Sequence, residues 1–161
     1  MKITTFAALA AVSVLAACAS KPAENGSGSQ GITNTAPSTG SVVPGSEEDL
    51  VANVGDRVFY EFNSSALTEA GQTTLSKQAD WLAKYPNVTV QVAGNCDDRG
   101  TEEYNLALGN RRANAAKDFL VAKGVSSSRL TTISYGKDRP TALGDDEQAW
   151  AQNRNAITAV K

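Results

Sequence analysis

One short segment of this chain gathers most of the side chains that could recognise a charged ligand. Residues 94–101 offer two carboxylates, a guanidinium, an amide and a hydroxyl within eight residues. Downstream, Asn105 and Arg112 stand seven residues apart, a spacing that places two side chains on one flank of a helix. A carboxylate such as Asp97 suits an ammonium group, and the fork of Arg112 suits a carboxylate. This pattern favours a site for a zwitterionic ligand, although Asp97 and Arg112 could equally form a structural ion pair.

The composition excludes most kinds of catalytic site. The chain of 161 residues contains no histidine, which excludes His-ligated zinc, Ser-His and Cys-His nucleophiles, and histidine acid-base chemistry. Its two cysteines, Cys18 and Cys96, cannot form a four-thiolate metal site. With 15 Lys and Arg against 17 Asp and Glu, the net charge of −2 is too balanced for a protein that coats nucleic acid. We therefore expect a binding protein with no cofactor, no metal and no catalytic activity.

Two features of the segment still resemble catalytic groups. Asp97 and Asp98 are adjacent, so they are poor candidates for flanking a glycosidic bond from two sides. Cys96 precedes both carboxylates, and their charge disfavours a thiolate. We expect Cys96 to be a small buried residue.

Hydrophobic patterning predicts the elements that position this segment. Strands are expected at 57–62, 88–93, 130–135 and 156–160, and helices at 68–84, 102–123 and 145–152. The order β-α-β-α-β-(α)-β predicts a two-layer α/β sandwich with the helices on one face of a mixed sheet. On the long helix, an expected core stripe comprises Leu106, Gly109, Ala113, Ala116 and Leu120. Asn105 and Arg112 are expected at the edge of that stripe, pointing toward the Asp97 segment.

The N-terminal region predicts export and a lipid anchor. Residues 1–17 have one positive charge and a twelve-residue apolar run, which is typical of a signal peptide and too short to span a bilayer. The sequence Leu-Ala-Ala-Cys at 15–18 resembles the bacterial lipobox, which implies cleavage before Cys18 and its acylation. Ala19, rather than Asp, then implies sorting to the outer membrane. The alternative is an ordinary secretory signal, after which Cys18 pairs with Cys96.

A change of composition separates this anchor from the predicted domain. Residues 18–46 are rich in Gly, Ser, Thr and Pro, with Ile32, Val42 and Val43 as the only large aliphatic residues. Such a segment buries too little apolar surface to offset the entropy of ordering, so it is expected to be a disordered tether. Residues 47–161 are expected to form one domain.

The segment 94–112 strongly resembles the OmpA-like peptidoglycan-binding domain. The family pattern Asn-x-x-Leu-(Gly/Ser)-x-x-Arg-Ala is met by Asn105, Leu108, Gly109, Arg112 and Ala113. The resemblance extends over nearly all of 50–161. It implies noncovalent binding of the peptide stem of peptidoglycan through its diaminopimelate residue. Asp97 would take the ammonium of that residue and Arg112 a carboxylate.

The resemblance implies further site residues and partners. The other positions that match the pocket of the family are Asn63, Asn95, Arg99, Thr101, Tyr104, Asn105 and Leu108. It also implies partnership with the Tol system, notably TolB, and a role in outer-membrane constriction at division. Two positions depart from the family: Asn63 replaces a common Asp, and Asn95 replaces a common His, so neither carries charge here. These departures leave open a protein-interaction module whose affinity for the wall is weakened.

Overall fold

The computed structural model describes residues 42–161. These residues lie within one compact unit, Thr39–Lys161. The expected signal peptide 1–17, the acylated Cys18 and most of the expected tether 18–46 lie outside the described residues. Within 42–161, none of the helices has the length and apolar character needed to cross a membrane.

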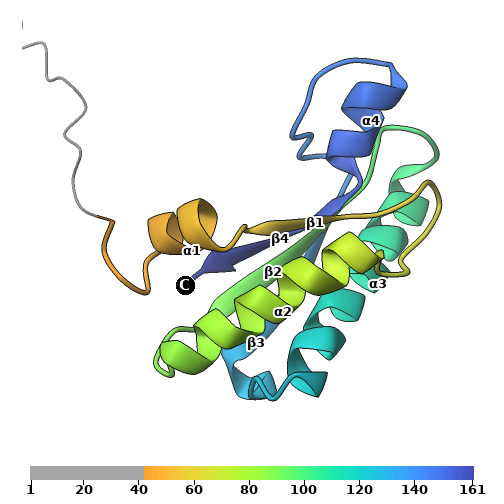
Figure 1. Cartoon of the computed structure of the whole chain (residues 1–161). Coiled ribbons are helices and arrows are strands. Elements are labelled where there is room, and N and C mark those ends of the chain that lie inside the picture. Colours follow the sequence, from red (N-terminus) through yellow and green to blue (C-terminus); the bar gives the residue numbers. More distant parts are fainter. Residues whose placement is uncertain (1–41) are drawn as a thin grey trace, which may run out of the picture. The chain divides into compact units, whose positions relative to one another are not determined.

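All seven predicted helices and strands are present, with small differences in their ends (Figure 1). In chain order they are α1 Glu47–Asn53, β1 Arg57–Phe59, α2 Glu69–Lys84, β2 Val90–Asn95, α3 Glu102–Ala122, a 3-10 turn Ser127–Arg129, β3 Leu130–Gly136, α4 Glu147–Asn153 and β4 Asn155–Val160. The helix α1 was not predicted. Ser46 is the N-cap of this helix, because its hydroxyl accepts from the amide of Asp49. The helix buries Leu50.

The four strands form one mixed sheet in the order β1-β4-β2-β3. β4 pairs antiparallel with both β1 and β2, whereas β2 and β3 are parallel. The strand β1 is shorter than the predicted 57–62 because its partner β4 begins at Asn155, opposite Phe59. One further bond, from the amide of Tyr60 to the carbonyl of Arg154, follows before the chain leaves the sheet.

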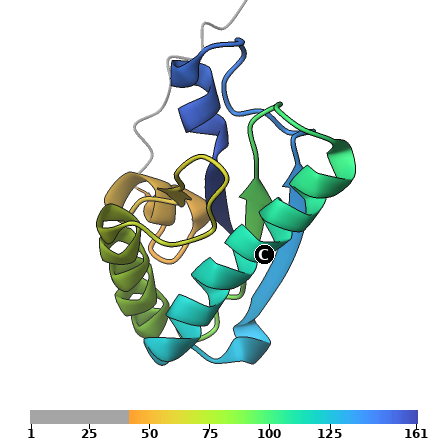
Figure 2. The ribbon, with the colours of Figure 1, turned by 90° about the vertical axis from the view of Figure 1, so that its right-hand side faces the viewer.

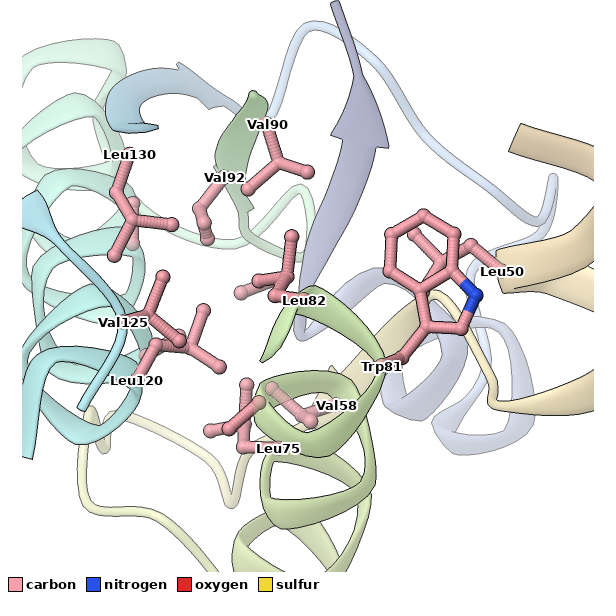
Figure 3. Packing of buried hydrophobic residues seen from close by; sticks show 14 of the residues in the cluster. Leu50, Val58, Leu75, Trp81, Leu82, Val90, Val92, Leu120, Val125 and Leu130 are labelled. Atoms are coloured by element: carbon pink, nitrogen blue, oxygen red, sulfur yellow. The ribbon is translucent and has the colours of Figure 1, made fainter. Parts of the chain in front are cut away.

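The helices α2 and α3 cover one face of this sheet (Figure 2), which confirms the predicted fold class. Leu75 and Leu82 of α2 pack with Val90 and Val92 of β2 and with Leu120 of α3 (Figure 3), and all five are at most 1% exposed. Strand residues that point to the other face, such as Gln91 and Ala93, are only partly buried.

Two glycines let α3 approach β2 closely. A Cβ atom on Gly94 would lie 2.6 Å from the carbonyl carbon of Gly109, and a Cβ on Gly109 would lie 2.8 Å from the carbonyl oxygen of Gly94. Only glycine permits this contact. The close approach brings the first half of α3 against the segment that follows β2.

Candidate functional site

A pocket of about 260 Å³ lies where the segment after β2, the turn after β1 and the first turns of α3 meet. We call it the loop–helix pocket; it is lined by Phe62, Asn63, Cys96, Asp97, Arg99, Gly100, Tyr104, Asn105, Leu108 and Arg112. Seven of the nine predicted ligand residues are among these. The turn after β1 and the segment after β2 therefore meet in space, although they are more than thirty residues apart in the chain.

Arg112 is the most deeply buried charged residue of the pocket, with 1% of its surface exposed. Its Nε donates to the carbonyl of Ser64 at 2.8 Å, Nη1 to that of Asn95 at 2.8 Å, and Nη2 to that of Glu61 at 3.2 Å. The prediction that Arg112 lies at the edge of the core is wrong, because these three carbonyls satisfy its guanidinium inside the protein. Burial lowers the pKa of Arg112, partly offset by nearby Cys96 and Asp97. A guanidinium has five N–H donors, so two are not used by these three carbonyls.

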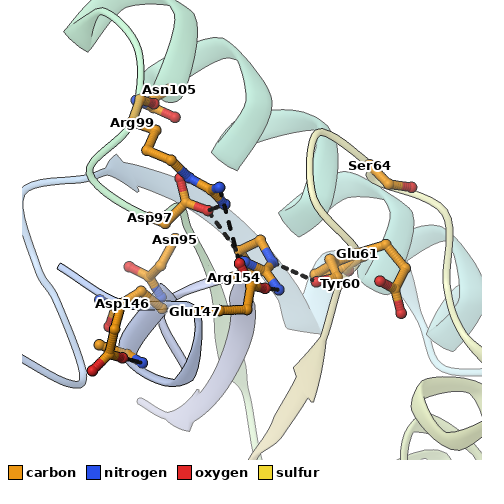
Figure 4. Close-up of polar contacts among 12 residues, drawn as sticks. Tyr60, Glu61, Ser64, Asn95, Asp97, Arg99, Asn105, Asp146, Glu147 and Arg154 are labelled. Carbon is orange, nitrogen blue, oxygen red and sulfur yellow. Dashed lines mark hydrogen bonds and ion pairs between the residues drawn. The ribbon is translucent and has the colours of Figure 1, made fainter. Parts of the chain in front are cut away.

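The carboxylate of Asp97 is already paired with two guanidinium groups (Figure 4). Its Oδ2 lies 2.6 Å from Nη2 of Arg99 and 3.4 Å from Nη1 of Arg154, and Arg154 in turn pairs with Glu147 at 2.6 Å. Burial opposes ionisation of Asp97, but hydrogen bonds from Arg99 and Arg154 outweigh it. The pKa of the Asp97 carboxyl therefore lies below its ordinary value.

Arg99 is held between two aromatic rings. Its guanidinium carbon lies 4.1 Å from the ring centre of Phe62 and 4.1 Å from that of Trp150. Stacking on aromatic faces leaves the edges of a guanidinium free to pair, here with Asp97. Trp150 and Glu147 belong to α4, so the last helix helps to position a residue of the pocket.

Asn63, Tyr104 and Asn105 bring polar side chains to the loop–helix pocket. The hydroxyl of Tyr104 hydrogen-bonds to the side-chain oxygen of Asn63, which has a left-handed backbone with φ of 53°. Asn is among the few residues that adopt this conformation readily. Asn105 is 2% exposed and donates to the carbonyls of Arg99 at 2.9 Å and Thr101 at 3.1 Å, which fixes the loop above α3.

Two predicted ligand residues do not line this pocket. The hydroxyl of Thr101 accepts from the amide of Tyr104 at 3.2 Å, so Thr101 is the N-cap of α3. The side chain of Asn95 points to the other face of the sheet and donates to Asn155 at 2.7 Å. Only its main-chain oxygen serves the pocket, through Arg112. In the expected helix stripe, Leu106 is 38% exposed, because Asn105 and Leu108 occupy the buried side.

Cys96 is a small buried residue, as predicted. It is 3% exposed, and its Sγ donates to the carbonyl of Asn105 at 3.4 Å. Burial raises the pKa of this thiol, and the nearby charge of Arg112 only partly opposes the shift. A thiol with a raised pKa is a poor nucleophile.

Sequence reasoning missed Arg154, Glu147 and Trp150. All three lie more than forty residues beyond Asp97, in and after a short helix that carries no ligand motif. The sequence around them carried no signal of a contact with Asp97.

Comparison with known proteins decides the family. Residues 59–154 match the OmpA family. This chain belongs to that family. It is similar to the peptidoglycan-associated lipoprotein of Mesorhizobium japonicum, with 50% identity over 153 residues, 95% of this chain and 89% of that one. It is also similar to the peptidoglycan-associated lipoprotein of Pseudomonas aeruginosa, with 42% identity over 160 residues, 96% of this chain and 95% of that one.

A solved structure of an OmpA-family relative has the same fold. The crystal structure of the peptidoglycan-associated lipoprotein from Burkholderia pseudomallei superposes with a TM-score of 0.64 at 40% identity, covering 66% of this chain and 90% of that one. The predicted family is therefore confirmed, and so is the mixed α/β fold. The loop–helix pocket lies within the matched residues 59–154.

Proposed function

We propose that this chain is an outer-membrane lipoprotein whose folded domain binds peptidoglycan without chemically altering it. The observation that carries the proposal is the loop–helix pocket, which brings together Asp97, Arg112 and five more of the predicted ligand residues. Two relatives that match nearly the whole chain are named peptidoglycan-associated lipoproteins, which supports the same ligand. Acylated Cys18 would hold the protein in the outer membrane, and the domain would link that membrane to the wall.

The charges of the pocket refine the proposed ligand contacts. Among its lining residues, two arginines face one aspartate, so the lining carries a net charge of +1. A carboxylate of diaminopimelate would bind the two free N–H groups of Arg112. The ammonium would have to compete with Arg99 for Asp97, because that carboxylate is already paired at 2.6 Å. We therefore assign more of the affinity to Arg112 than to Asp97.

The test is cosedimentation of the full-length chain, in detergent, with purified diaminopimelate-type peptidoglycan. Arg112→Lys keeps the charge but loses the fork, and Asp97→Asn keeps the shape but loses the charge. Hydrogen bonds to charged groups contribute about 1.5–3 kcal/mol, so binding should weaken by about 10–150-fold, with Arg112→Lys toward the upper end of this range and Asp97→Asn toward the lower end. Arg111→Lys and Asp98→Asn are the matched controls, since both neighbours are exposed.

The outcome separates the proposal from its alternatives. Each variant is first checked for a thermal unfolding transition, so that loss of binding is not loss of fold. If Arg112→Lys binds peptidoglycan as tightly as the parent, the pocket assignment is wrong. Release of soluble muropeptides during the assay would instead indicate an enzyme.

A second candidate is a module that binds a periplasmic protein such as TolB. It is favoured by the apolar rim of the pocket, where Phe62 is 60% exposed and Tyr104 is 43% exposed. Aromatic residues of this kind are enriched in protein interfaces. If the parent chain does not cosediment with peptidoglycan but binds TolB, this becomes the leading function. If both bind, competition between them would show that they share the pocket, as expected for a Tol-system partner acting in constriction.

A further inference from the structure

A second pocket, of about 250 Å³, lies on the face of the sheet opposite α2 and α3. We call it the sheet-face pocket. It is lined by Gln91, Ala93, Asn95, Tyr135, Arg139, Ile157 and Ala159. The floor is apolar, and the small side chains of Ala93 and Ala159 beside Ile157 leave space over it. Its volume is just below the range of about 300–1,000 Å³ for pockets that hold drug-sized ligands, so it suits a smaller molecule.

Among the described residues that line the sheet-face pocket, only Arg139 is charged. Its guanidinium carbon lies 3.7 Å from the ring centre of Tyr135. Within 42–161, Arg139 forms no ion pair with a carboxylate. A guanidinium that contacts an aromatic ring still has N–H groups available for a bidentate acceptor. This arrangement is complementary to a carboxylate.

An unpartnered acceptor lines the same pocket. Asn95 is 3% exposed, and its Oδ1 accepts no hydrogen bond from the described part of the chain. The orientation of its amide is fixed by Asn155, whose Nδ2 donates to Thr141 at 3.2 Å and to the carbonyl of Gln152 at 2.6 Å. The Oδ1 of Asn155 must therefore accept, and Nδ2 of Asn95 donates to it at 2.7 Å. The Oδ1 of Asn95 is therefore a buried acceptor without a donor in residues 42–161, which costs free energy that a donor from a bound molecule would offset.

We infer that the sheet-face pocket binds the C-terminal carboxylate of a peptide with small apolar side chains. The carboxylate would pair with Arg139, a methyl group would lie over Ala93 and Ile157, and a peptide N–H would donate to Asn95. This inference does not depend on the proposed function, because none of the three contacts uses the cavity of the loop–helix pocket. Asn95 nevertheless joins the two pockets, since its main-chain oxygen accepts from Arg112 at 2.8 Å.

The test is titration of the full-length chain, in detergent, with acetyl-Ala-Ala in its L and D forms. Calorimetry gives the affinity, and the ¹H–¹⁵N signals of the Asn95 and Gln91 side-chain amides locate the ligand. We expect saturable binding that moves both signals. Arg139→Ala should weaken it by about tenfold or more, because a charged hydrogen bond is lost. Ala93→Leu should abolish it by filling the floor, and Arg111→Ala, which removes the same charge from an exposed site, should leave it unchanged.

The two enantiomers distinguish the sources of such a carboxylate. Preference for the L form indicates the C-terminus of a protein, whereas preference for the D form indicates a stem peptide of the wall. Either preference supports the pocket if Arg139→Ala and Ala93→Leu both reduce binding. The inference is overturned if neither form binds, or if binding survives both changes. It is also overturned if Arg112→Lys abolishes binding while Arg139→Ala and Ala93→Leu do not reduce it, because the ligand then occupies the loop–helix pocket.

Discussion

The two halves of α3 bury different kinds of side chain: the C-terminal half buries apolar residues, and the N-terminal half also buries polar ones. In the C-terminal half, Ala113, Ala116 and Leu120 are 0% exposed and belong to the apolar core. In the N-terminal half, the buried residues include Asn105 and Arg112, at 2% and 1% exposed. Buried polar groups are tolerated only where they are hydrogen-bonded, and both of these donate to backbone carbonyls of neighbouring loops. The comparison suggests that the apolar half stabilises the domain while the polar half holds the loops of the pocket in place.

The largest expected effect comes from the contact of α3 with β2. Gly94→Ala would place a Cβ 2.6 Å from the carbonyl carbon of Gly109, closer than real Cβ contacts come to a backbone atom. We expect a loss of stability of more than about 4 kcal/mol, because both backbones would have to move apart. The measurement is the free energy of unfolding in urea.

Gly71→Ala is the matched control for this change. Gly71 lies in α2, and a Cβ there would meet the hydroxyl of Thr68 at 3.3 Å, a contact with a side chain rather than with backbone. We expect a change of less than about 1 kcal/mol. If Gly94→Ala lowers the free energy of unfolding as little as Gly71→Ala, the close approach of α3 to β2 is not needed for stability.

The next largest effect is a loss of stability in the apolar half that leaves ligand binding by the pocket unchanged. Leu120→Ala removes a fully buried side chain at the far end of α3 from the pocket, and such changes cost about 2–5 kcal/mol. We expect this loss in urea unfolding, while peptidoglycan binding by the folded fraction stays as in the parent. Val121→Ala is the control, because Val121 is 39% exposed. Weaker wall binding in Leu120→Ala would mean that the two halves are not independent.

Sequence patterns predicted the apolar half better than the polar half. The spacing of Ala113, Ala116 and Leu120 follows directly from the helical repeat, and all three are buried. The same geometry placed Arg112 at the edge of the core. A helical wheel cannot show that the turn after β1 returns across α3 and supplies the carbonyls of Glu61 and Ser64.

The residues around Asp97 show the same limit. The sequence indicated Asp97 and Arg99 because they share one loop with other polar groups. Arg154 and Glu147 pair within this cluster only because β4 returns beside β2, at a sequence separation that no local motif covers. The missed helix α1 is a different case, since Ser46 followed by acidic residues was a readable N-cap signal.

The smallest expected effect is the pH dependence of Asp97, in the segment that the polar half of α3 packs against. The folded pKa of Asp97 lies below its ordinary value of 3.8, since hydrogen bonds from Arg99 and Arg154 outweigh burial. Its contribution to stability is therefore fully present above about pH 4 and is lost as the pH falls through the folded pKa. Part of the contribution is screened by water, because the side chain of Arg99 is 32% exposed.

Comparison of the parent with Asp97→Asn measures this contribution. The difference in their free energies of unfolding should be constant from pH 7 to about pH 5 and should shrink steadily below pH 4. Asp98→Asn is the matched control, since Asp98 is exposed and forms no ion pair with residues 42–161. If the difference in free energy of unfolding between the parent and Asp97→Asn does not change with pH, the charge of Asp97 does not strengthen its pairing with Arg99 and Arg154. The stability that Asp97 contributes would then come from the geometry of its hydrogen bonds alone. The bonds from Arg112 to backbone carbonyls already involve no charged acceptor.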